Sequence, residues 1–338
     1  MDIQTFNKEL SLTSKRECEF SALQILSSIR PQWPKDCIEF EYFSVGITNK
    51  IFAAKCDEEA VIFRVFGKNT DKIINRNNEV IAWKKLAIHS LAAPIYAQFK
   101  NGLVCGFIEG KSLEMEMMKA PETRRRIARS IAHLHKMVPR ENKPICFKKM
   151  REFFSAFSSD FDDERKQKFY NCHFPANLEP EIRNLEMKIT EMNEEIAFCH
   201  NDLLVHNIVY NPENNTINFI DYEYAATNYV LFEIGNHFCE YAGVEDTPDY
   251  TQCLSNVEKM AFLHDYLENR DSRVDMSRLN VMMARIPIFE AAAHLFWTIW
   301  ALVQSQNSTI DFDYLAYAYA RYEQYKKRYN KYNLCHKF

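Results

Sequence analysis

The stretch Phe198-Cys-His-Asn-Asp-Leu-Leu-Val-His-Asn-Ile-Val-Tyr210, continued by Thr216-Ile-Asn-Phe-Ile-Asp-Tyr-Glu-Tyr224, decides how the rest of this chain is interpreted. Short apolar runs before, between and after its polar residues predict small strands. Residues 200–207 are therefore expected to form a loop between two strands. The polar residues 212–215 predict a turn that joins the second strand to the third.

Three oxygen-bearing side chains occupy fixed places in this pattern: Asp202, Asn207 five residues later, and Asp221 at the end of the last strand. Transfer of a γ-phosphoryl group needs a carboxylate that orients or deprotonates the acceptor hydroxyl, and oxygen ligands that hold Mg²⁺ against the phosphates of ATP. We assign the first role to Asp202 and the metal-binding role to Asn207 and Asp221. Protein kinases use the same order of residues.

Each of these residues also has an ordinary structural interpretation, as a capping or turn Asp, a surface Asn and a strand-end Asp. The ordered set, with His200-Asn201 directly ahead of it, favours a kinase-type site over three unrelated coincidences.

Three segments together resemble the signature of the choline/ethanolamine kinases: His200-Asn-Asp-Leu-Leu-Val-His-Asn207, Ile220-Asp-Tyr-Glu-Tyr-Ala225 and Ile234-Gly-Asn-His-Phe-Cys-Glu240. Further similarity extends from about Phe43 to Tyr325. The resemblance implies an α+β, two-lobed protein-kinase-like fold. A small antiparallel-sheet lobe that binds nucleotide is expected over residues 1–109, and a larger, mainly helical lobe with the catalytic and amine-binding residues over 110–338.

The resemblance also implies where ATP, the co-substrate, is contacted. Val45-Gly-Ile-Thr-Asn49 is similar to the family's phosphate loop, although Val45 replaces a glycine, and an ordinary hairpin remains an alternative. Arg64 lies within an apolar strand and corresponds to the residue that contacts phosphates; Glu79 would be its ion-pair partner or a solvated helix residue. The expected nucleotide-binding residues are Gly46, Thr48, Asn49, Arg64 and Glu79.

An aromatic pocket for a cationic amine is the other implied site. Trp297 and Trp300 are three residues apart, hence on one helix face, and tyrosines follow on the last helix. Such stripes are usually core packing, but aromatic faces also attract ammonium groups by about 0.5 to 2 kcal/mol. By resemblance, the amine-binding residues are Tyr224, Glu240, Trp297, Trp300 and Tyr317.

The sequence after Glu240, Tyr-Ala-Gly-Val244, together with Leu203-Leu204, resembles the ethanolamine branch of the family. We therefore expect a kinase that phosphorylates the hydroxyl of ethanolamine. A choline kinase, a dual kinase and a catalytically silent scaffold are the alternatives. A protein kinase is disfavoured because the chain lacks the Asp-Phe-Gly and Ala-Pro-Glu segments. Glu233 stands where the family usually has Asp, and His237 is expected to be structural.

Composition limits the remaining function classes. A net charge of −4 and a pI near 6.2 argue against a nucleic-acid partner. The ten cysteines show no CxxC spacing and, with a polar N-terminus, predict a reduced cytoplasmic protein. Residues 286–303 are apolar but contain Pro287, Glu290 and His294, so we expect a buried amphipathic helix rather than a membrane span. The sequence leaves a homodimer open.

Overall fold

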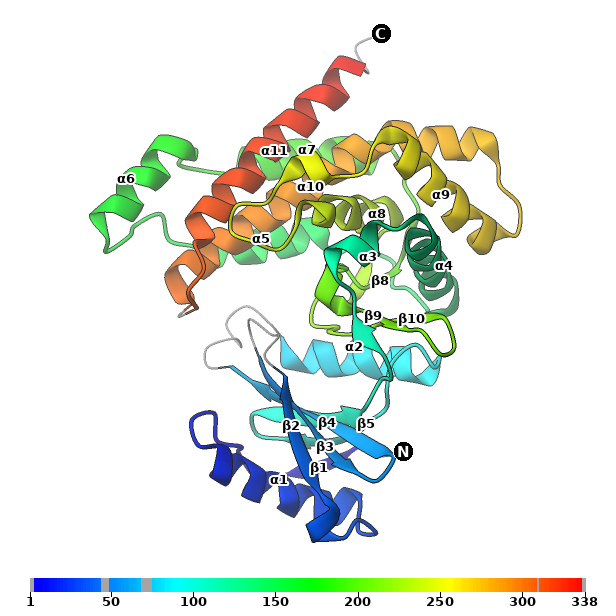
Figure 1. Cartoon of the computed structure of the whole chain (residues 1–338). Coiled ribbons are helices and arrows are strands. Elements are labelled where there is room, and N and C mark those ends of the chain that lie inside the picture. The colour runs from blue at the N-terminus through cyan, green and yellow to red at the C-terminus, as the bar shows by residue number, and fades with distance from the viewer. Residues whose placement is uncertain (1–2, 44–48, 68–74, 309, 336–338) are drawn as a thin grey trace. The chain divides into compact units, whose positions relative to one another are not determined.

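The computed structural model describes residues 3–43, 49–67, 75–308 and 310–335 of the chain. It divides into two compact units, Met1–Lys111 and Ser112–Phe338 (Figure 1). In the described residues, the first unit contains a β-sheet with two α-helices, and the second unit is mainly helical. The predicted α+β class, with a small sheet and a mostly helical remainder, is confirmed. Val45, Gly46 and Thr48 of the predicted phosphate loop lie outside the described residues, as does the side chain of Asn49.

The first unit is built on a sheet whose strand order is β1-β5-β6-β4-β3-β2. Every pairing is antiparallel except that of β1 with β5. Asp57, with φ +53°, begins the short turn between β3 and β4. The strands are β1 (Gln4–Phe6), β2 (Glu39–Phe43), β3 (Asn49–Cys56), β4 (Glu59–Phe66), β5 (Ile95–Phe99) and β6 (Gly102–Gly106).

Alternation along the strands gives this sheet two different faces. On one face, Phe52 and Phe63 stack with their ring centroids 4.9 Å apart. This face packs against the apolar side of α1 (Lys15–Ile29). Arg64, the residue after Phe63 on β4, points to the opposite face. It forms an ion pair with Glu79 of α2 (Arg76–Ile88), so α2 lies on that face. Helix α1 begins where Ser14 accepts a hydrogen bond from the Glu17 N–H, and α2 where Asn75 caps it.

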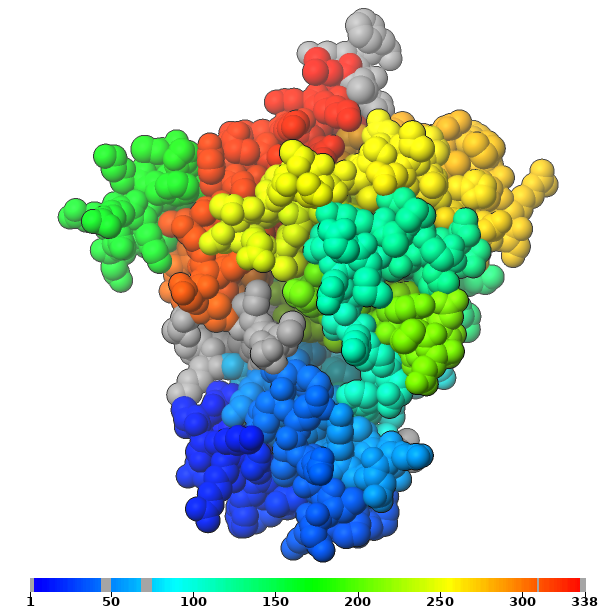
Figure 2. Space-filling model, in the orientation of Figure 1, coloured from blue at the N-terminus to red at the C-terminus, as the bar shows by residue number. Residues whose placement is uncertain are grey.

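The second unit is a set of helices arranged around α10 (Met276–Asn307). The other helices are α3 (Met115–Lys119), α4 (Pro121–Met137), α5 (Cys146–Ala156), α6 (Glu164–His173), α7 (Glu179–Glu191), α8 (Val230–Cys239), α9 (Asn256–Asp271) and α11 (Tyr314–Cys335). Figure 2 shows α6 in green beside the orange start of α11. The Phe169 and His173 rings of α6 contact Tyr319 of α11 there.

Helix α10 forms the centre of the second unit. Its residues from Ile288 to Ile299 are all buried, so the predicted amphipathic character is wrong for this part of the helix. The helix is long and apolar enough to cross a membrane by length and composition, but 89% of its apolar window is buried inside the protein. Gly235 lets α8 approach closely, since a Cβ there would lie 3.1 Å from the Glu290 backbone nitrogen.

Short strands carry the signature sequence in this unit. Strands β8 (Ile196–Cys199) and β11 (Ala226–Tyr229) pair antiparallel, and β9 (Ile208–Asn211) pairs with β10 (Thr216–Phe219) in the hairpin that the turn residues predict. Strand β7 (Lys111–Ser112), which the sequence did not indicate, extends the β9–β10 sheet. The segment between β8 and β9 is a loop ending in the 3₁₀ helix η3 (Val205–Asn207).

Candidate functional site

Asp202 and Asn207 are joined within the loop that links β8 to β9. The Asn207 side-chain amide donates to the Asp202 carbonyl oxygen at 2.8 Å and to its carboxylate Oδ2 at 3.1 Å. The 3₁₀ turn brings these residues together although they are five apart. Because the amide nitrogen is used on Asp202, the amide oxygen is the atom that remains to ligate a cation.

Asp221 follows β10 in a left-handed conformation, with φ +66°. Asp tolerates this region better than most residues. The preceding Ile220 N–H donates to the Asn207 carbonyl oxygen at 3.0 Å, and the Ile220 carbonyl oxygen accepts from His200 Nε2 at 2.8 Å. The backbone therefore holds the Asp221 segment against the loop that carries Asp202 and Asn207. Asn207 and Asp221 together offer the amide and carboxylate oxygens that suit Mg²⁺.

The electrostatic environment of Asp202 is acidic. Burial raises the pKa of Asp202 well above its usual range, and the carboxylates of Glu240, Asp221 and Glu223 raise it further, while the Asn207 hydrogen bond acts in the opposite direction. A cation among these groups would relieve their mutual repulsion. The donor chemistry and the charge thus both fit a divalent metal.

Asn201 holds the loop in place. It adopts a left-handed conformation, with φ +67°, and its side-chain amide donates to the Tyr224 carbonyl oxygen at 3.0 Å. Its Oδ1 accepts a hydrogen bond from Asn228 at 2.8 Å. Its backbone carbonyl accepts a hydrogen bond from the Asn236 amide at 3.1 Å. The sequence placed Asn201 in the motif but assigned it no role.

Two buried residues of α8, Glu233 and His237, contact the backbone of the same loop. The Asn201 N–H donates to Glu233 Oε1 at 2.6 Å, and Glu233 Oε2 lies 2.6 Å from His135 Nε2. The pKa of Glu233 is lowered although burial opposes this, because the hydrogen bond and charge of His135 favour the carboxylate. His237 Nδ1 lies 2.8 Å from the Leu203 carbonyl oxygen, and burial lowers the pKa of His237 to about 4. His237 is therefore neutral at pH 7 and packs within the fold.

Tyr224, Trp297 and Trp300 form a continuous aromatic wall. The Tyr224 and Trp297 ring centroids are 5.3 Å apart, and those of Trp297 and Trp300 are 5.4 Å apart. Trp300 Nε1 donates to the Tyr224 hydroxyl at 2.8 Å, and Trp297 Nε1 donates to Asn236 Oδ1 at 2.7 Å. Since Asn236 also donates to Asn201, a chain of hydrogen bonds connects the wall to the loop of Asp202.

Glu240 and Tyr317 are held by Arg321, a buried residue that the sequence did not single out. Arg321 Nη2 donates to Glu240 Oε1 at 2.6 Å, and Arg321 Nε donates to the Tyr317 hydroxyl at 2.9 Å. In the ring contacts described, Tyr317 does not touch a tryptophan. Its ring contacts Phe312, which contacts Tyr314, and Tyr314 contacts Trp300 of the aromatic wall. The spacing of Tyr317 and Arg321, one helical turn apart, was the only sequence signal for this arrangement.

Arg64 and Glu79, in the first unit, form a buried ion pair. Arg64 Nη1 lies 3.0 Å from Glu79 Oε1, and Arg76 Nη1 lies 2.8 Å from Glu79 Oε2. Both Arg64 and Glu79 are almost fully buried, at 3% and 1% exposure. The pairing explains how a cation is accommodated inside an apolar strand.

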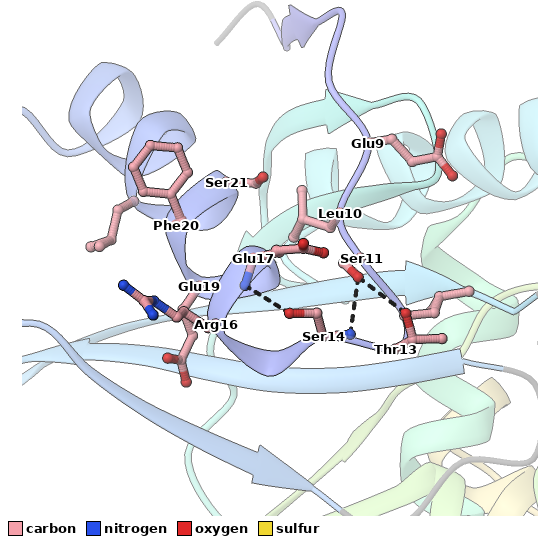
Figure 3. A pocket seen from close by; sticks show the side chains of 12 residues that line it. Glu9, Leu10, Ser11, Thr13, Ser14, Arg16, Glu17, Glu19, Phe20 and Ser21 are labelled. Atoms are coloured by element: carbon pink, nitrogen blue, oxygen red, sulfur yellow. Dashed lines mark hydrogen bonds between the residues drawn. The ribbon is translucent and has the colours of Figure 1, made fainter.

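A surface hollow of about 1040 Å³ lies between α1 and the segment before it (Figure 3). Two of its hydroxyl groups accept hydrogen bonds from backbone N–H groups. Ser11 accepts a hydrogen bond from the Ser14 N–H, and Ser14 accepts one from the Glu17 N–H. The lining contains no Cys, His or Asp, and we assign it to helix capping rather than to chemistry.

A mixed α+β fold in which the loop of Asp202 and Asn207 is followed by Asp221 has the order of residues that kinase-like phosphotransferases use. The family model for choline/ethanolamine kinase matches residues 40–326. The chain belongs to the choline/ethanolamine kinase family.

Individual relatives agree with this family. Human (Homo sapiens) ethanolamine kinase 2 is 35% identical over 312 residues, covering 90% of this chain and 80% of that protein. Mouse (Mus musculus) ethanolamine kinase 1 is 34% identical over 330 residues, covering 93% and 90%. The structure of an ethanolamine kinase from Plasmodium vivax superposes with a TM-score of 0.82 at 26% identity, covering 93% of this chain and 89% of that one.

Proposed function

We propose that this chain catalyses the ATP-dependent phosphorylation of the hydroxyl of ethanolamine, giving phosphoethanolamine. The reaction is the first step of the CDP-ethanolamine route to phosphatidylethanolamine, and we expect it to take place in the cytoplasm. The observation that carries the proposal is the hydrogen-bonded path from Trp297 through Asn236 to Asn201, beside Asp202. It couples an aromatic wall that suits an ammonium group to a buried carboxylate that suits an alcohol.

Asp202 acts as the base or orienting group for the acceptor hydroxyl. Its raised pKa increases the basicity of the carboxylate, and its hydrogen bond from Asn207 fixes the direction of Oδ2. Asn207 and Asp221 would hold Mg²⁺, which supplies charge neutralisation on the transferred phosphoryl group when bound. Arg64, oriented by Glu79, is assigned to the phosphates of ATP, together with Gly46, Thr48 and Asn49.

The amine end of the substrate is assigned to Tyr224, Trp297, Trp300, Tyr317 and Glu240. Because Arg321 uses Oε1 of Glu240, the second carboxylate oxygen is the one proposed to accept from the ammonium group. An ethanolammonium group offers three N–H donors, whereas choline offers none. A carboxylate beside the aromatic wall therefore favours ethanolamine, and choline kinase activity is the second candidate.

The test is a kinetic comparison on the purified protein. With Mg²⁺ and ATP, kcat/KM for ethanolamine should exceed kcat/KM for choline. The Asp202→Asn variant should lower kcat about 1000-fold, a typical effect of removing a general base, while its thermal unfolding midpoint stays close to that of the native chain. Glu213→Gln, an exposed carboxylate on the β9–β10 turn, is the control and should be fully active. No turnover on either amine would instead support the scaffold alternative.

A further inference from the structure

Cys37 and Cys56 bring two sulfur atoms together in the first unit, although they lie far apart in the sequence. Cys37 ends the 3₁₀ helix η1 (Lys35–Cys37), and Cys56 ends β3. Their Sγ atoms are 2.6 Å apart. Non-bonded heavy atoms make optimal contact at roughly 3.5–4.0 Å, so the side chains are already closer than two unconnected groups prefer.

We propose that Cys37 and Cys56 form a reversible disulfide that closes the base of the β2–β3 hairpin. The site is a modification site independent of the proposed kinase reaction. Strands β2 and β3 flank residues 44–48, so the bond would join the two strands at the end opposite those residues.

Contacts that do not involve sulfur hold the two cysteines near each other. Trp33, just before η1, donates from Nε1 to Glu59 Oε2 at 3.1 Å, and Arg30 Nε lies 3.6 Å from the same oxygen. Glu59 is the β4 partner of Cys56. Beyond η1, Glu39 pairs with Lys55 in the β2–β3 register. The backbone on both sides of Cys37 is thus anchored next to Cys56 whether or not a bond forms.

The two thiols differ in exposure, and this difference decides which of them reacts first with a small disulfide. Cys37 is half-buried, whereas Cys56 is 4% exposed. In exchange with a small disulfide such as oxidised glutathione, the Cys37 thiolate attacks one sulfur, forms a mixed disulfide and releases one glutathione thiolate. The Cys56 thiolate then attacks the Cys37 sulfur and releases the second. The protein loses two electrons and two protons, and one glutathione disulfide becomes two thiols.

Nearby groups keep the Cys56 thiol protonated. The contact with Cys37, burial, and the carboxylates of Asp57 and Glu59 together raise the pKa of Cys56 to about 12. The thiolate that closes the disulfide is therefore scarce at neutral pH, and closure should be faster in alkaline solution.

Mass spectrometry of the full-length protein tests the proposal. After equilibration with increasing ratios of oxidised to reduced glutathione, we expect the mass to fall by two hydrogens and a peptide pair joined through Cys37 and Cys56 to appear, both reversed by dithiothreitol. Cys37→Ser and Cys56→Ser should each abolish the cross-linked pair. Cys172→Ser, which removes an exposed cysteine, is the control and should leave it unchanged.

Thermal unfolding supplies a second measurement. Closing the segment between Cys37 and Cys56 restricts the unfolded chain, so oxidation should raise the unfolding midpoint of the first unit by roughly 8–16 °C, and Cys37→Ser should show no such rise. Stable glutathione adducts on Cys37 without an internal bond would overturn the proposal. The ligand atoms of Cys37, Cys56 and Asp57 also lie close enough together to bind Zn²⁺. Zn²⁺ binding at these residues, with no cross-link in the metal-free protein, would overturn the proposal as well.

Discussion

The Glu233 carboxylate contacts two groups at once, and these contacts depend on the length of its side chain. One carboxylate oxygen accepts from the Asn201 N–H and the other lies 2.6 Å from His135 Nε2. The chain resembles a family that usually has Asp at this position, so the additional methylene accounts for the reach to both partners. The residue thus connects α4, α8 and the loop that carries Asp202.

Shortening Glu233 should therefore loosen the loop. We expect Glu233→Asp to lose one of the two contacts and to destabilise the fold by about 1–3 kcal/mol, because a buried partner is left without its hydrogen bond. Glu233→Ala should cost about 3–5 kcal/mol, since it removes one member of a buried pair. Urea unfolding measures both, and kcat should fall in the same order. Equal stability of Asp and Glu at this position would contradict the assignment.

The pH dependence of the same contact has a defined sign. The folded pKa of Glu233 is depressed, so the carboxylate contributes stability above the unfolded pKa, near 4.5, and this contribution is lost as the pH falls through the lower folded value. Glu233→Gln should accordingly be less stable than the native chain at pH 7. The difference between the two unfolding free energies should shrink below about pH 4.5. A constant difference across this range would contradict the lowered pKa.

Helix α10 carries two tryptophans that donate hydrogen bonds to different partners. They share a face because they are three residues apart, and this much follows from the sequence. Their partners do not. Trp297 bonds to Asn236 on α8 and so to the loop of Asp202, whereas Trp300 bonds to the hydroxyl of Tyr224.

Replacing each tryptophan by Phe keeps an aromatic face but removes the N–H donor. We expect Trp297→Phe mainly to lower kcat, by about 5- to 30-fold, because the bond lost, worth about 1–2 kcal/mol, positions Asn236. Trp300→Phe should mainly raise the KM for ethanolamine by a similar factor, because it changes the wall itself. Steady-state kinetics of the two variants, each serving as control for the other, separates these effects. Identical changes in kcat and KM would show that the wall acts only as packing.

The limits of sequence-based prediction also appear at this scale. The β9–β10 hairpin and the loop between β8 and β9 follow from apolar runs and turn residues, which are local signals. Strand β11 and the Arg321–Glu240 contact depend on partners far away in the chain. The sequence singles out the aromatic residues of α10 and α11, but it gives no sign of Arg321, the cation that contacts Glu240. The burial of α10 on all sides also required knowledge of its neighbours, because an apolar segment alone does not reveal how many surfaces cover it.

At the scale of the whole molecule, the net charge of −4 hides a strong local imbalance. The carboxylates of Asp221, Glu223 and Glu240 all raise the pKa of the buried Asp202. Like charges gathered in a poorly solvated place oppose folding, and they persist where a ligand compensates for them. The signature sequence supplies these groups in order, but only the fold shows that they act on one another.

Mg²⁺ alone should therefore stabilise the protein before any nucleotide is added. At a concentration about ten times its dissociation constant, a cation that binds only the folded state adds about 1.4 kcal/mol, or roughly 2–4 °C in the unfolding midpoint. Scanning calorimetry with and without MgCl₂ measures the shift, with NaCl at equal ionic strength as reference. Asp221→Asn should lose most of the shift, because it removes a proposed ligand, whereas Glu213→Gln should retain it. Chelation by EDTA should lower turnover at least about 100-fold, and added Mg²⁺ should restore it. If both variants responded to Mg²⁺ as the native chain does, the metal would be bound elsewhere, and Asn207 and Asp221 would lose their assigned role.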